Sequence, residues 1–499
     1  MSSWRVLQGL FLAGVTAACF AITVTQAQAG DWARFRGPNG TGISADSDPL
    51  PTTFSETENL KWKVALPGAG VSCPIVVGDR VFVTCYSGYG LDRQNPGELK
   101  DLKRHLVCID RANGETLWEK TVEAVMPEDE FFGAGVPEHG YASHTPVSDG
   151  KNVYVFFGKS GVFAYDLDGK ELWNASVGTG SDNMAWGSSS SPIVHEDLLV
   201  VAAGAEARAV VGLDKNTGKE LWRSESDSLG SVWGTPAVSK VDDSRTDIVI
   251  GAPYEIWGIN PATGKLKWFC NALESNQFNS SVLVTDSTIF ASEGGRGGGG
   301  SIAVKTGGKG DITASNVVWT VSDSSTFSTP LLFEDRLYLV SGGMAKCISA
   351  ADGKEIFQAR LQAGAAGGAP GSGAPGGRGP GAGGFGGGGG QPPVGGGPGG
   401  FGGGGQPPGG GGRGGRGGFG GFGGGGMGGD YSSPVLGDGK IYYVTRGGDI
   451  HVIKAGDTFE KLATNRLTSE SEDFSATPAI SDGQIFFRSS KHLYCVSEQ

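Results

Sequence analysis

The chain contains an internal repeat, and this feature restricts its fold more than any other. A Ser/Thr-rich pair followed by an anchor residue precedes a strand-turn-strand pattern eight times, with proline at seven anchors and valine at one: Pro74, Pro146, Pro192, Pro236, Val282, Pro330, Pro434 and Pro478. Successive anchors are 72, 46, 44, 46, 48, 104 and 44 residues apart. A period of 44–48 residues suits one four-stranded blade of a β-propeller. We therefore predict an all-β, eight-bladed β-propeller of four-stranded blades.

Each repeat also carries turn and packing signals. Asp149-Gly150 separates two β-rich runs, as a tight hairpin turn requires, and Asp438-Gly439 and Asp482-Gly483 repeat the device. The third strand then runs into an Asp/Asn-x-x-x-Gly-x-x-x-Trp tail, whose glycine forms a turn. We expect the large apolar side chains at the end of the tail to dock neighbouring blades together. The predicted docking residues are Trp62, Trp118, Trp173, Trp222, Trp268 and Trp319.

The N-terminal part of the chain completes the last repeat. That repeat reaches Gln499 just after its third strand, Leu493 to Val496, and lacks a fourth strand. Leu60 to Val64 has the character of that strand, and its Trp62 lies 12 residues before Pro74. We expect this N-terminal strand to close the ring in the last blade, because closure removes exposed sheet edges.

The first 29 residues have the pattern of an export signal. Arg5 precedes an apolar stretch from Val6 to Val24, and Ala27-Gln28-Ala29 offers a small-x-small cleavage site. An uncleaved anchor and lipid attachment at Cys19 are alternatives. We expect an exported protein, periplasmic, outer-membrane-associated or secreted, with no transmembrane span in the mature chain.

Two further segments lie outside the repeat. Residues 30–59 form an N-terminal extension before the propeller, which we assign to 60–499. Residues 363–429 are a Gly/Pro-rich insertion within the propeller, interpreted as a disordered loop because it has little to bury. Arg413 and Arg416 in this insertion resemble an RNA-binding tract. The net charge of −12 argues against nucleic acid as a partner.

The Trp-bearing tail resembles the docking motif of the PQQ-like (pyrroloquinoline-quinone-type) repeat family, which includes quinone-dependent dehydrogenases and BamB-type proteins. The opening Asp31-Trp32-Ala33-Arg34-Phe35-Arg36-Gly37-Pro38 is also similar to the start of exported members. The resemblance covers most of the chain from Trp62 onward. It implies the propeller fold, and it leaves the cofactor open because the motif holds blades together.

The chain departs from the dehydrogenases at their functional positions. Their adjacent cysteine pair, calcium-ligand segments and catalytic aspartate have no counterpart here, and no Cys-x-x-Cys-His haem site is present. We therefore expect a non-catalytic exported scaffold, similar to BamB, that binds a protein partner or another extracytoplasmic ligand, with no catalytic residue, metal or cofactor. The alternative is a PQQ-dependent dehydrogenase with a divergent site that uses PQQ and calcium.

Candidate ligand-binding residues lie just before the anchors. Aromatic residues recur there and are expected to circle one mouth of the central channel, with Asp182 and Asn279 placed to orient a ligand. The competing interpretation is that these rings only wedge adjacent blades. The aromatic candidates are Tyr141, Trp186, Trp233, Phe278, Phe327, Tyr431 and Phe474.

Two other groups of residues have chemical potential. Glu128-Asp129-Glu130 with Glu138, His139 and His144 has ligands for calcium or zinc but no recognised ligand spacing, so we interpret it as a solvated connecting loop. Cys73 and Cys85 flank one hairpin, and a disulfide between them is possible in an oxidising compartment.

Overall fold

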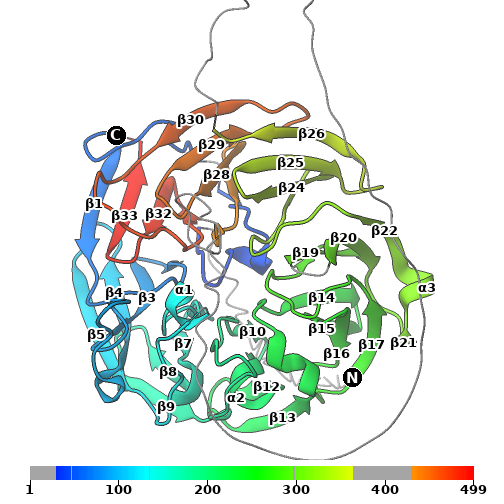
Figure 1. Ribbon diagram of the computed structural model, residues 1–499, viewed down its shortest axis with the longest axis horizontal. Coiled ribbons are helices and arrows are strands. Elements are labelled where there is room, and N and C mark those ends of the chain that lie inside the picture. The colour runs from blue at the N-terminus through cyan, green and yellow to red at the C-terminus, as the bar shows by residue number, and fades with distance from the viewer. Residues whose placement is uncertain (1–29, 47, 134, 296–297, 363–428, 499) are drawn as a thin grey trace, which may run out of the picture. The chain divides into compact units, whose positions relative to one another are not determined.

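A computed structural model describes residues 30–46, 48–133, 135–295, 298–362 and 429–498. These residues form eight sheets arranged as blades around a central axis (Figure 1). The prediction of an eight-bladed propeller is confirmed. The predicted export signal and most of the Gly/Pro-rich insertion lie outside the described residues.

Blades 1 to 4 follow the chain, each running from its inner to its outer strand. Blade 1 comprises β2 (Ile75–Val77), β3 (Arg80–Ser87), β4 (Lys103–Asp110) and β5 (Thr116–Glu123). Blade 2 comprises β6 (Val147–Ser148), β7 (Asn152–Phe156), β8 (Val162–Asp166) and β9 (Glu171–Ala175). Blade 3 comprises β10 (Ile193–His195), β11 (Leu198–Ala203), β12 (Ala209–Asp214) and β13 (Glu220–Glu225). Blade 4 comprises β14 (Ala237–Asp242), β15 (Arg245–Ala252), β16 (Glu255–Ile259) and β17 (Leu266–Asn271).

Blades 5 to 7 repeat this order, and blade 8 takes its outer strand from the N-terminal part of the chain. Blade 5 comprises β18 (Leu283–Val284), β19 (Thr288–Gly295), β20 (Gly298–Lys305) and β22 (Val317–Val321). Blade 6 comprises β23 (Leu331–Phe333), β24 (Arg336–Ser341), β25 (Met344–Ser349) and β26 (Glu355–Arg360). Blade 7 comprises β27 (Val435–Gly437), β28 (Lys440–Val444), β29 (Ile450–Lys454) and β30 (Lys461–Asn465). Blade 8 comprises β31 (Ala479–Ser481), β32 (Gln484–Arg488), β33 (His492–Ser497) and β1 (Leu60–Ala65).

Blade 8 joins the two ends of the described chain. Its outer strand, β1, pairs antiparallel with β33, with Trp62 opposite Cys495 and Val64 opposite Leu493. Figure 1 shows the blue N-terminal strand beside the red C-terminal one. The predicted closure by an N-terminal strand is therefore present, and β33 is not left as an edge.

Five of the six predicted docking tryptophans contact the next blade in the same way. Each indole Nε1 donates to a backbone carbonyl in the turn before the outer strand of that blade: Trp62 to Arg111, Trp118 to Leu167, Trp173 to Lys215, Trp222 to Pro261 and Trp319 to Ala350. The glycine of the turn lies against the ring, so a side chain there would collide with it. Core clusters accordingly combine residues of neighbouring blades, such as Tyr154 of blade 2 with Leu199 of blade 3.

Trp268 makes a different contact. Its Nε1 donates to Oδ2 of Asp247, in its own blade, at 2.8 Å. The turn that it would meet in blade 5 is replaced by a longer connection containing β21 (Gly310–Asp311) and α3 (Thr313–Asn316). β21 pairs in parallel with β17 and becomes a fifth strand of blade 4. The longer connection thus removes the usual docking surface.

The N-terminal extension crosses the middle of the ring, where Figure 1 shows it in blue. Trp32 forms a β-bridge with Val76 of blade 1, and Ile43 forms one with Leu436 of blade 7. Between them, the buried Arg36 guanidinium donates to five backbone carbonyls: Gly40, Thr41, Thr329, Pro330 and Pro434. Burial lowers the pKa of Arg36 to about 9. The extension is therefore an integral part of the folded ring.

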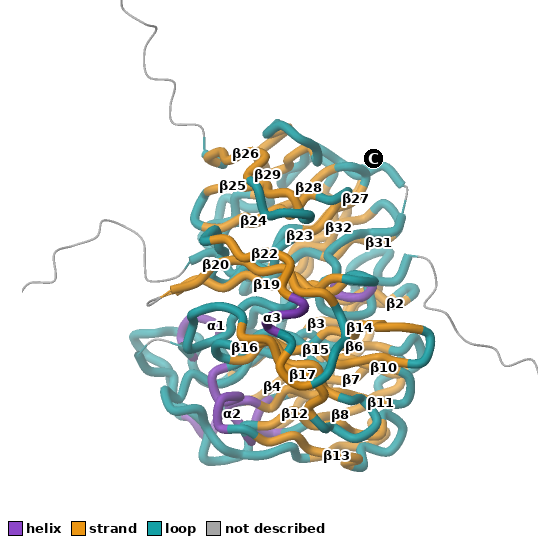
Figure 2. Tube along the Cα trace, turned by 90° about the vertical axis from the view of Figure 1, so that its right-hand side faces the viewer, coloured by secondary structure: helices purple, strands orange, loops and turns teal. Residues whose placement is uncertain are grey.

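The short helices lie in loops between strands, except η1, which lies in the N-terminal extension. α1 (Val136–His139) precedes blade 2 and α2 (Gly204–Ala207) connects β11 to β12, while η1 (Pro38–Gly40), η2 (Leu99–Asp101), η3 (Gly158–Ser160) and η4 (Asp227–Ser231) are single 3-10 turns. α1 and α2 lie on the same face of the ring (Figure 2). The backbone N–H of Gly78, just past the end of β2, donates to the side chain of Asp31. This part of the N-terminal extension therefore lies at the end of the inner strands opposite to the face with α1 and α2. Within the described residues, no helix is long and apolar enough to cross a bilayer.

Candidate functional site

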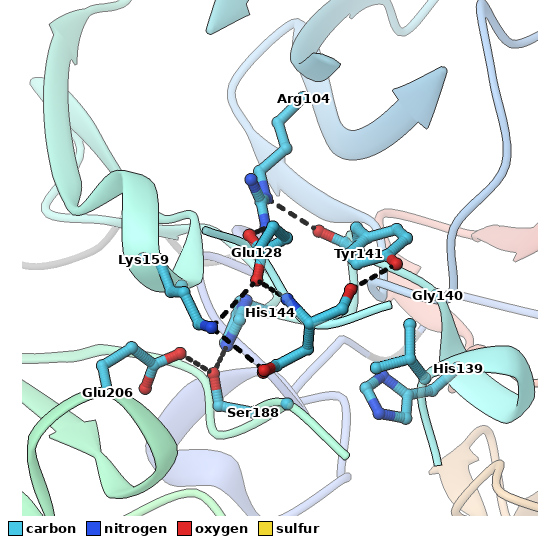
Figure 3. Close-up of a pocket in the computed structure, with 13 residues that line it drawn as sticks. Arg104, Glu128, His139, Gly140, Tyr141, His144, Lys159, Ser188 and Glu206 are labelled. Carbon is cyan, nitrogen blue, oxygen red and sulfur yellow. Dashed lines mark hydrogen bonds and ion pairs between the residues drawn. The ribbon is translucent and has the colours of Figure 1, made fainter. Parts of the chain in front are cut away.

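A small pocket lies where loops of blades 1, 2 and 3 meet, on the face that carries α1 and α2 (Figure 3). Its cavity volume of about 20 Å³ holds roughly one water-sized group. The pocket is lined by Arg104, Glu128, Asp129, Val136, His139, Gly140, Tyr141, His144, Gly158, Lys159, Gly187, Ser188 and Glu206. Its wall therefore combines titratable side chains with three glycines.

Two buried cations in the pocket are paired with two buried carboxylates. Nη2 of Arg104 lies 2.5 Å from Oε2 of Glu128, and Nζ of Lys159 lies 3.0 Å from Oδ1 of Asp129. The Lys159 ammonium also donates to the carbonyl of Pro127 and to Oγ of Ser181. Buried ions persist when they are paired and hydrogen-bonded in this way. These four charges cancel, and both cations are already engaged.

A second chain of polar groups crosses the pocket from blade 3 to blade 2. Oγ of Ser188 donates to Oε1 of Glu206 at 2.5 Å, and Nε2 of His144 lies 2.9 Å from the same Oγ (Figure 3). Because the Ser188 proton goes to Glu206, Nε2 of His144 carries the proton of this second bond. In the described part of the chain, Nδ1 of His144 and Oε2 of Glu206 are buried and have no hydrogen-bond partner. This series of hydrogen bonds thus ends in two acceptor atoms that have no donor.

Burial changes the protonation of Glu206 and His144, the residues at the two ends of this series of hydrogen bonds. It raises the pKa of Glu206 to about 7, an effect that the hydrogen bond from Ser188 opposes and the nearby Glu128 carboxylate increases. It lowers the pKa of His144 to about 3, helped by the positive charge of Arg104. His144 is therefore neutral at pH 7, and Glu206 is poised between its two forms.

This raised pKa predicts a pH-dependent stability. The folded state holds a proton on Glu206 between its ordinary pKa of 4.5 and about 7, where the unfolded state releases it. The free energy of unfolding therefore falls as pH rises through this window. Glu206→Gln cannot ionise, so we expect it to match the parent at pH 4 and to exceed it by roughly 3 kcal/mol at pH 8.

Denaturant unfolding at pH 4, 6 and 8 measures the difference. The exposed Glu225→Gln, on β13 of blade 3, serves as the matched control and should follow the parent at every pH. Equal stability of Glu206→Gln and the parent at pH 8 would contradict the assignment of a buried, proton-holding carboxyl at this position.

The interpretation of the acidic stretch as a solvated loop is wrong for three of its residues. Glu128, Asp129 and His144 are buried, while Glu130 is exposed. The sequence does not show that Arg104 of β4 and Lys159 of the β7–β8 connection pair with these carboxylates. His139 lines the same pocket, but its ring bonds to Ser143 and to the carbonyl of Trp186.

Glu138 extends from α1 across the mouth of the ring. Its Oε2 lies 2.7 Å from Nη1 of Arg446 in blade 7, and its Oε1 lies 2.7 Å from Nη2 of Arg93. Nε of Arg446 also contacts Asp473, and the guanidinium lies over the ring of Tyr431. Burial alone would raise the pKa of Glu138, but the two arginines outweigh it and hold the pKa below its usual value. Ion pairs thus fix α1 over the mouth.

Four of the seven predicted aromatic candidates form two contacting pairs, and the other three lie separately. Trp186 and Trp233 are half-buried with ring centroids 6.0 Å apart, and Phe327 and Tyr431 form a second half-buried pair at 4.5 Å. The other three, Tyr141, Phe278 and Phe474, are buried. Tyr141 lines the pocket, and its hydroxyl donates to the carbonyl of Asp129.

The two polar candidates are engaged locally. Asp182 accepts hydrogen bonds from the backbone N–H groups of Met184, Trp186 and Gly187, and so shapes its own loop. Asn279 binds the buried carboxylate of Glu293 through its backbone and side-chain nitrogens. Asn279 lies in the connection to blade 5 and is not among the pocket residues.

The proposed disulfide is absent, because Cys73 and Cys85 are both free, buried thiols. Ile75 of β2 lies opposite Phe82 of β3, a register that extends to place Cys73 opposite Thr84. Cys85 is one residue out of register and points to the other side of the sheet. Burial raises the pKa of the Cys85 thiol to about 11.

Two of the pocket residues that sequence reasoning missed share one position in the repeat with Arg446 at the mouth. Lys159 and Glu206 lie in the connection between the second and third strands of blades 2 and 3, and Arg446 lies in the same connection of blade 7. Each of these three connections carries a charged residue. Aligning these connections across the repeats would have shown the signal.

The fold and its docking contacts define the chain as a PQQ-like β-propeller. A family model described as outer membrane protein assembly factor BamB matches residues 102–359. The chain belongs to this family, because the match covers more than half of its 499 residues. No curated protein matches it in sequence.

Solved structures of a BamB protein and of two dehydrogenases resemble this chain. BamB from Moraxella catarrhalis is 11% identical, with a TM-score of 0.53 over 88% of this chain and 97% of that one. A europium-containing methanol dehydrogenase is 11% identical, with a TM-score of 0.56 over 94% and 98%. A quinohemoprotein alcohol dehydrogenase from Comamonas testosteroni is 11% identical, with a TM-score of 0.53 over 94% and 81%. At this identity the similarity shows the fold alone.

The residues of the pocket do not fit a metal-bound quinone. The cavity is far smaller than the 300–1,000 Å³ typical of cofactor sites, and its two cations are already paired with carboxylates. Across the described ranges, no three His, Cys, Asp or Glu side chains gather as metal ligands would. The N-terminal extension also fills the middle of the ring through Trp32 and Arg36.

Proposed function

We propose that the protein is a non-catalytic binding scaffold that engages a protein partner with the face carrying α1 and α2. The observation that carries this proposal is the set of exposed apolar side chains on the loops of that face. Phe132 is 82% exposed and Met184 62% exposed, and Leu91, Val125 and Met126 are also exposed there. We call these five residues the mouth set.

The loops that carry the mouth set are packed against one another. Phe131 N–H donates to the hydroxyl of Tyr89, which joins the loop of Leu91 to that of Phe132. Gly135 lies against the ring of Trp186, which joins the loop of Phe132 to that of Met184. Exposed apolar groups that share a fixed surface are typical of protein interaction sites. Ion pairs of Glu138 hold this surface in place before a partner arrives.

Among the described residues, six of the other seven large exposed apolar side chains lie on outer strands, including Leu266 and Leu462, while Tyr254 lies in the β15–β16 turn of blade 4. Leu117, Leu172, Leu221 and Val318 each directly precede a docking tryptophan on an outer strand, one per blade. They recur with the repeat and are spread around the ring, whereas the mouth set comes from adjacent loops of different length. This difference supports the face with α1 and α2 as the binding face.

The proposed location follows from the family and from the N-terminal pattern. The matching family is described by an outer membrane assembly factor, and residues 1–29 have the composition of an export signal. We place the scaffold outside the cytoplasm, at or near the outer membrane.

Photo-crosslinking tests the binding face. A photoreactive amino acid at Phe132 or Met184 of the full chain should form adducts with another protein in living cells. The same group at Leu221, which is 53% exposed on an outer strand, is the matched control and should form none of these adducts. Identical adducts from all three positions, or none from the mouth set, would contradict the proposal. Dye-linked alcohol oxidation by purified protein with PQQ and calcium would favour the dehydrogenase instead.

A further inference from the structure

We propose that the hydrogen-bonded series of His144, Ser188 and Glu206 is a pH switch for the mouth set. The loops of the binding face are held together while Glu206 carries a proton, and they loosen when Glu206 ionises. This regulation rests on the proposed function, because the switch acts on the same binding face.

The helix α2, which carries Glu206, is joined to the loop of Met184 by three hydrogen bonds. They run from Gly180 N–H to the carbonyl of Glu206 at 2.8 Å, from Ser188 Oγ to Glu206 Oε1 at 2.5 Å, and from Arg208 Nη2 to Asn183 Oδ1 at 2.9 Å. Arg208 directly follows α2, and Asn183 directly precedes Met184. The position of Met184 therefore depends on α2.

The loop of Met184 also contacts α1 and the loop of Phe132. Gly135, in the loop of Phe132, lies against the ring of Trp186, which belongs to the loop of Met184. Nε2 of His139, in α1, donates to the carbonyl of Trp186 at 2.8 Å. Loosening of the Met184 loop therefore removes support from Phe132 and α1 as well.

Glu206 has no counter-charge of its own. The two cations of the pocket, Arg104 and Lys159, are paired with Glu128 and Asp129. Within the described part of the chain, Glu206 forms no ion pair and its Oε2 accepts no hydrogen bond. Its side chain is buried, so ionisation creates an unpaired buried charge, which is costly. Ionised Glu206 therefore favours a loosened loop, in which water reaches the carboxylate.

Burial has the largest influence on the proton of Glu206, and it raises the pKa to about 7. The hydrogen bond from Ser188 and the charge of Arg104 oppose this rise, and the charge of Glu128 adds to it. His144, behind Ser188, is neutral at pH 7 because burial lowers its pKa to about 3.

The other elements packed against α2 add no free charge near Glu206. These elements are η3, η4 and β12. Lys159 of η3 is paired with Asp129, and Asp227 of η4 is paired with Arg208. β12 begins with apolar residues. The pocket groups and burial therefore set the protonation of Glu206.

The switch has a defined direction with pH. In the closed face Glu206 has a pKa of about 7, whereas a loosened loop returns the carboxyl to its ordinary pKa of 4.5. Below pH 4.5 both states hold the proton, and between pH 4.5 and 7 only the closed face holds it. The equilibrium between the two states therefore moves toward the loosened face as pH rises through this window and levels off above it. From pH 6 to pH 8 it changes about tenfold.

Hydrogen–deuterium exchange of the full chain, followed by mass spectrometry, tests the switch. Labelling times are kept too short for exchange of β32, so that only local opening is measured. After correction for the intrinsic pH dependence of amide exchange, protection of residues 178–190 and 204–208 should fall about tenfold from pH 6 to pH 8. An unchanged protection in the parent would overturn the inference without any variant.

Two variants identify the group that titrates. Glu206→Gln cannot ionise and should keep the same protection at pH 6 and pH 8. Glu293→Gln removes a buried glutamate whose pKa is also raised, in blade 5 outside the pocket, and should lose protection as the parent does. If Glu206→Gln still lost protection as pH rises, another group would be responsible and the assignment to Glu206 would be wrong.

Crosslinking connects the switch to binding. With the photoreactive group at Met184 in isolated cell envelopes, the adduct yield should fall from pH 6 to pH 8 in the parent and stay constant in Glu206→Gln. Protection that falls with pH while the yield stays constant would overturn the control of binding by Glu206. An absence of adducts at both pH values would contradict the proposed function alone, because the exchange measurement needs no partner.

Discussion

Deleting residues 30–66 is expected to abolish the folded monomer. The deletion removes β1, so β33 becomes an unpaired edge in blade 8. It also removes the buried side chains of Trp32, Leu50, Phe54 and Trp62. At about 1.5–3 kcal/mol each, their loss approaches the roughly 5–15 kcal/mol that stabilises a typical domain. Size-exclusion chromatography should show aggregates, and circular dichroism should show no cooperative melting.

A rearranged chain provides the control for this deletion. Appending residues 56–66 after Gln499 through a short turn restores the fourth strand of blade 8 in the order used by the other seven blades. Because Ser497 N–H already donates to the carbonyl of Asn59, a hairpin there requires little rearrangement. This chain should recover a monomeric fraction and a melting transition. A truncated protein that melts like the parent without the added strand would refute closure by β1.

The number of blades and the closure could be predicted because the repeats within the chain can be compared with one another. Eight anchors and a recurring Trp-bearing tail specify the same local structure eight times, so one irregular copy does not hide the rest. One docking tryptophan does not follow the pattern. Trp268 has the expected tail, but its partner is set by the length of the blade 5 connection, which is not part of its own repeat.

The N-terminal extension and the pocket were harder to predict, for two different physical reasons. The contacts of Arg36 are with backbone carbonyls, which every sequence offers, so no complementary residue type marks them. The pocket brings together Arg104 of strand β4 with Glu128, Lys159 and Glu206, which come from three separate connections between strands. Each of these residues alone resembles a solvated surface charge, and only their spatial pairing shows that they are buried.

The contacts that join the blades are therefore separate from the loops of the face that carries α1 and α2. Repeated contacts between neighbouring blades, such as that of Trp222 with Pro261, hold the ring together. The loops of unequal length on one face carry the mouth set and the pocket, and they vary without disturbing those contacts.

Replacing Trp222 with alanine is expected to lower the free energy of unfolding by about 3–5 kcal/mol, the range for large aromatic truncations in packed cores. The ring fills the space between blades 3 and 4, where a Cβ on Gly264 would lie 2.5 Å from it. Its Nε1 donates to the carbonyl of Pro261 at 2.7 Å, so truncation also leaves that carbonyl without its partner. Denaturant unfolding followed by tryptophan-independent circular dichroism measures the loss.

Two further variants separate the sources of this effect. Trp222→Phe keeps most of the packing and removes the hydrogen bond, so it should cost about 1 kcal/mol from that bond, with a smaller packing loss in addition. Leu221→Ala changes the neighbouring side chain, which is exposed on the outer strand, and should stay within about 0.5 kcal/mol of the parent. If Trp222→Ala unfolded at the same denaturant concentration as Leu221→Ala, the tryptophan would not be holding blades 3 and 4 together. The five equivalent contacts would then need another explanation for their recurrence around the ring.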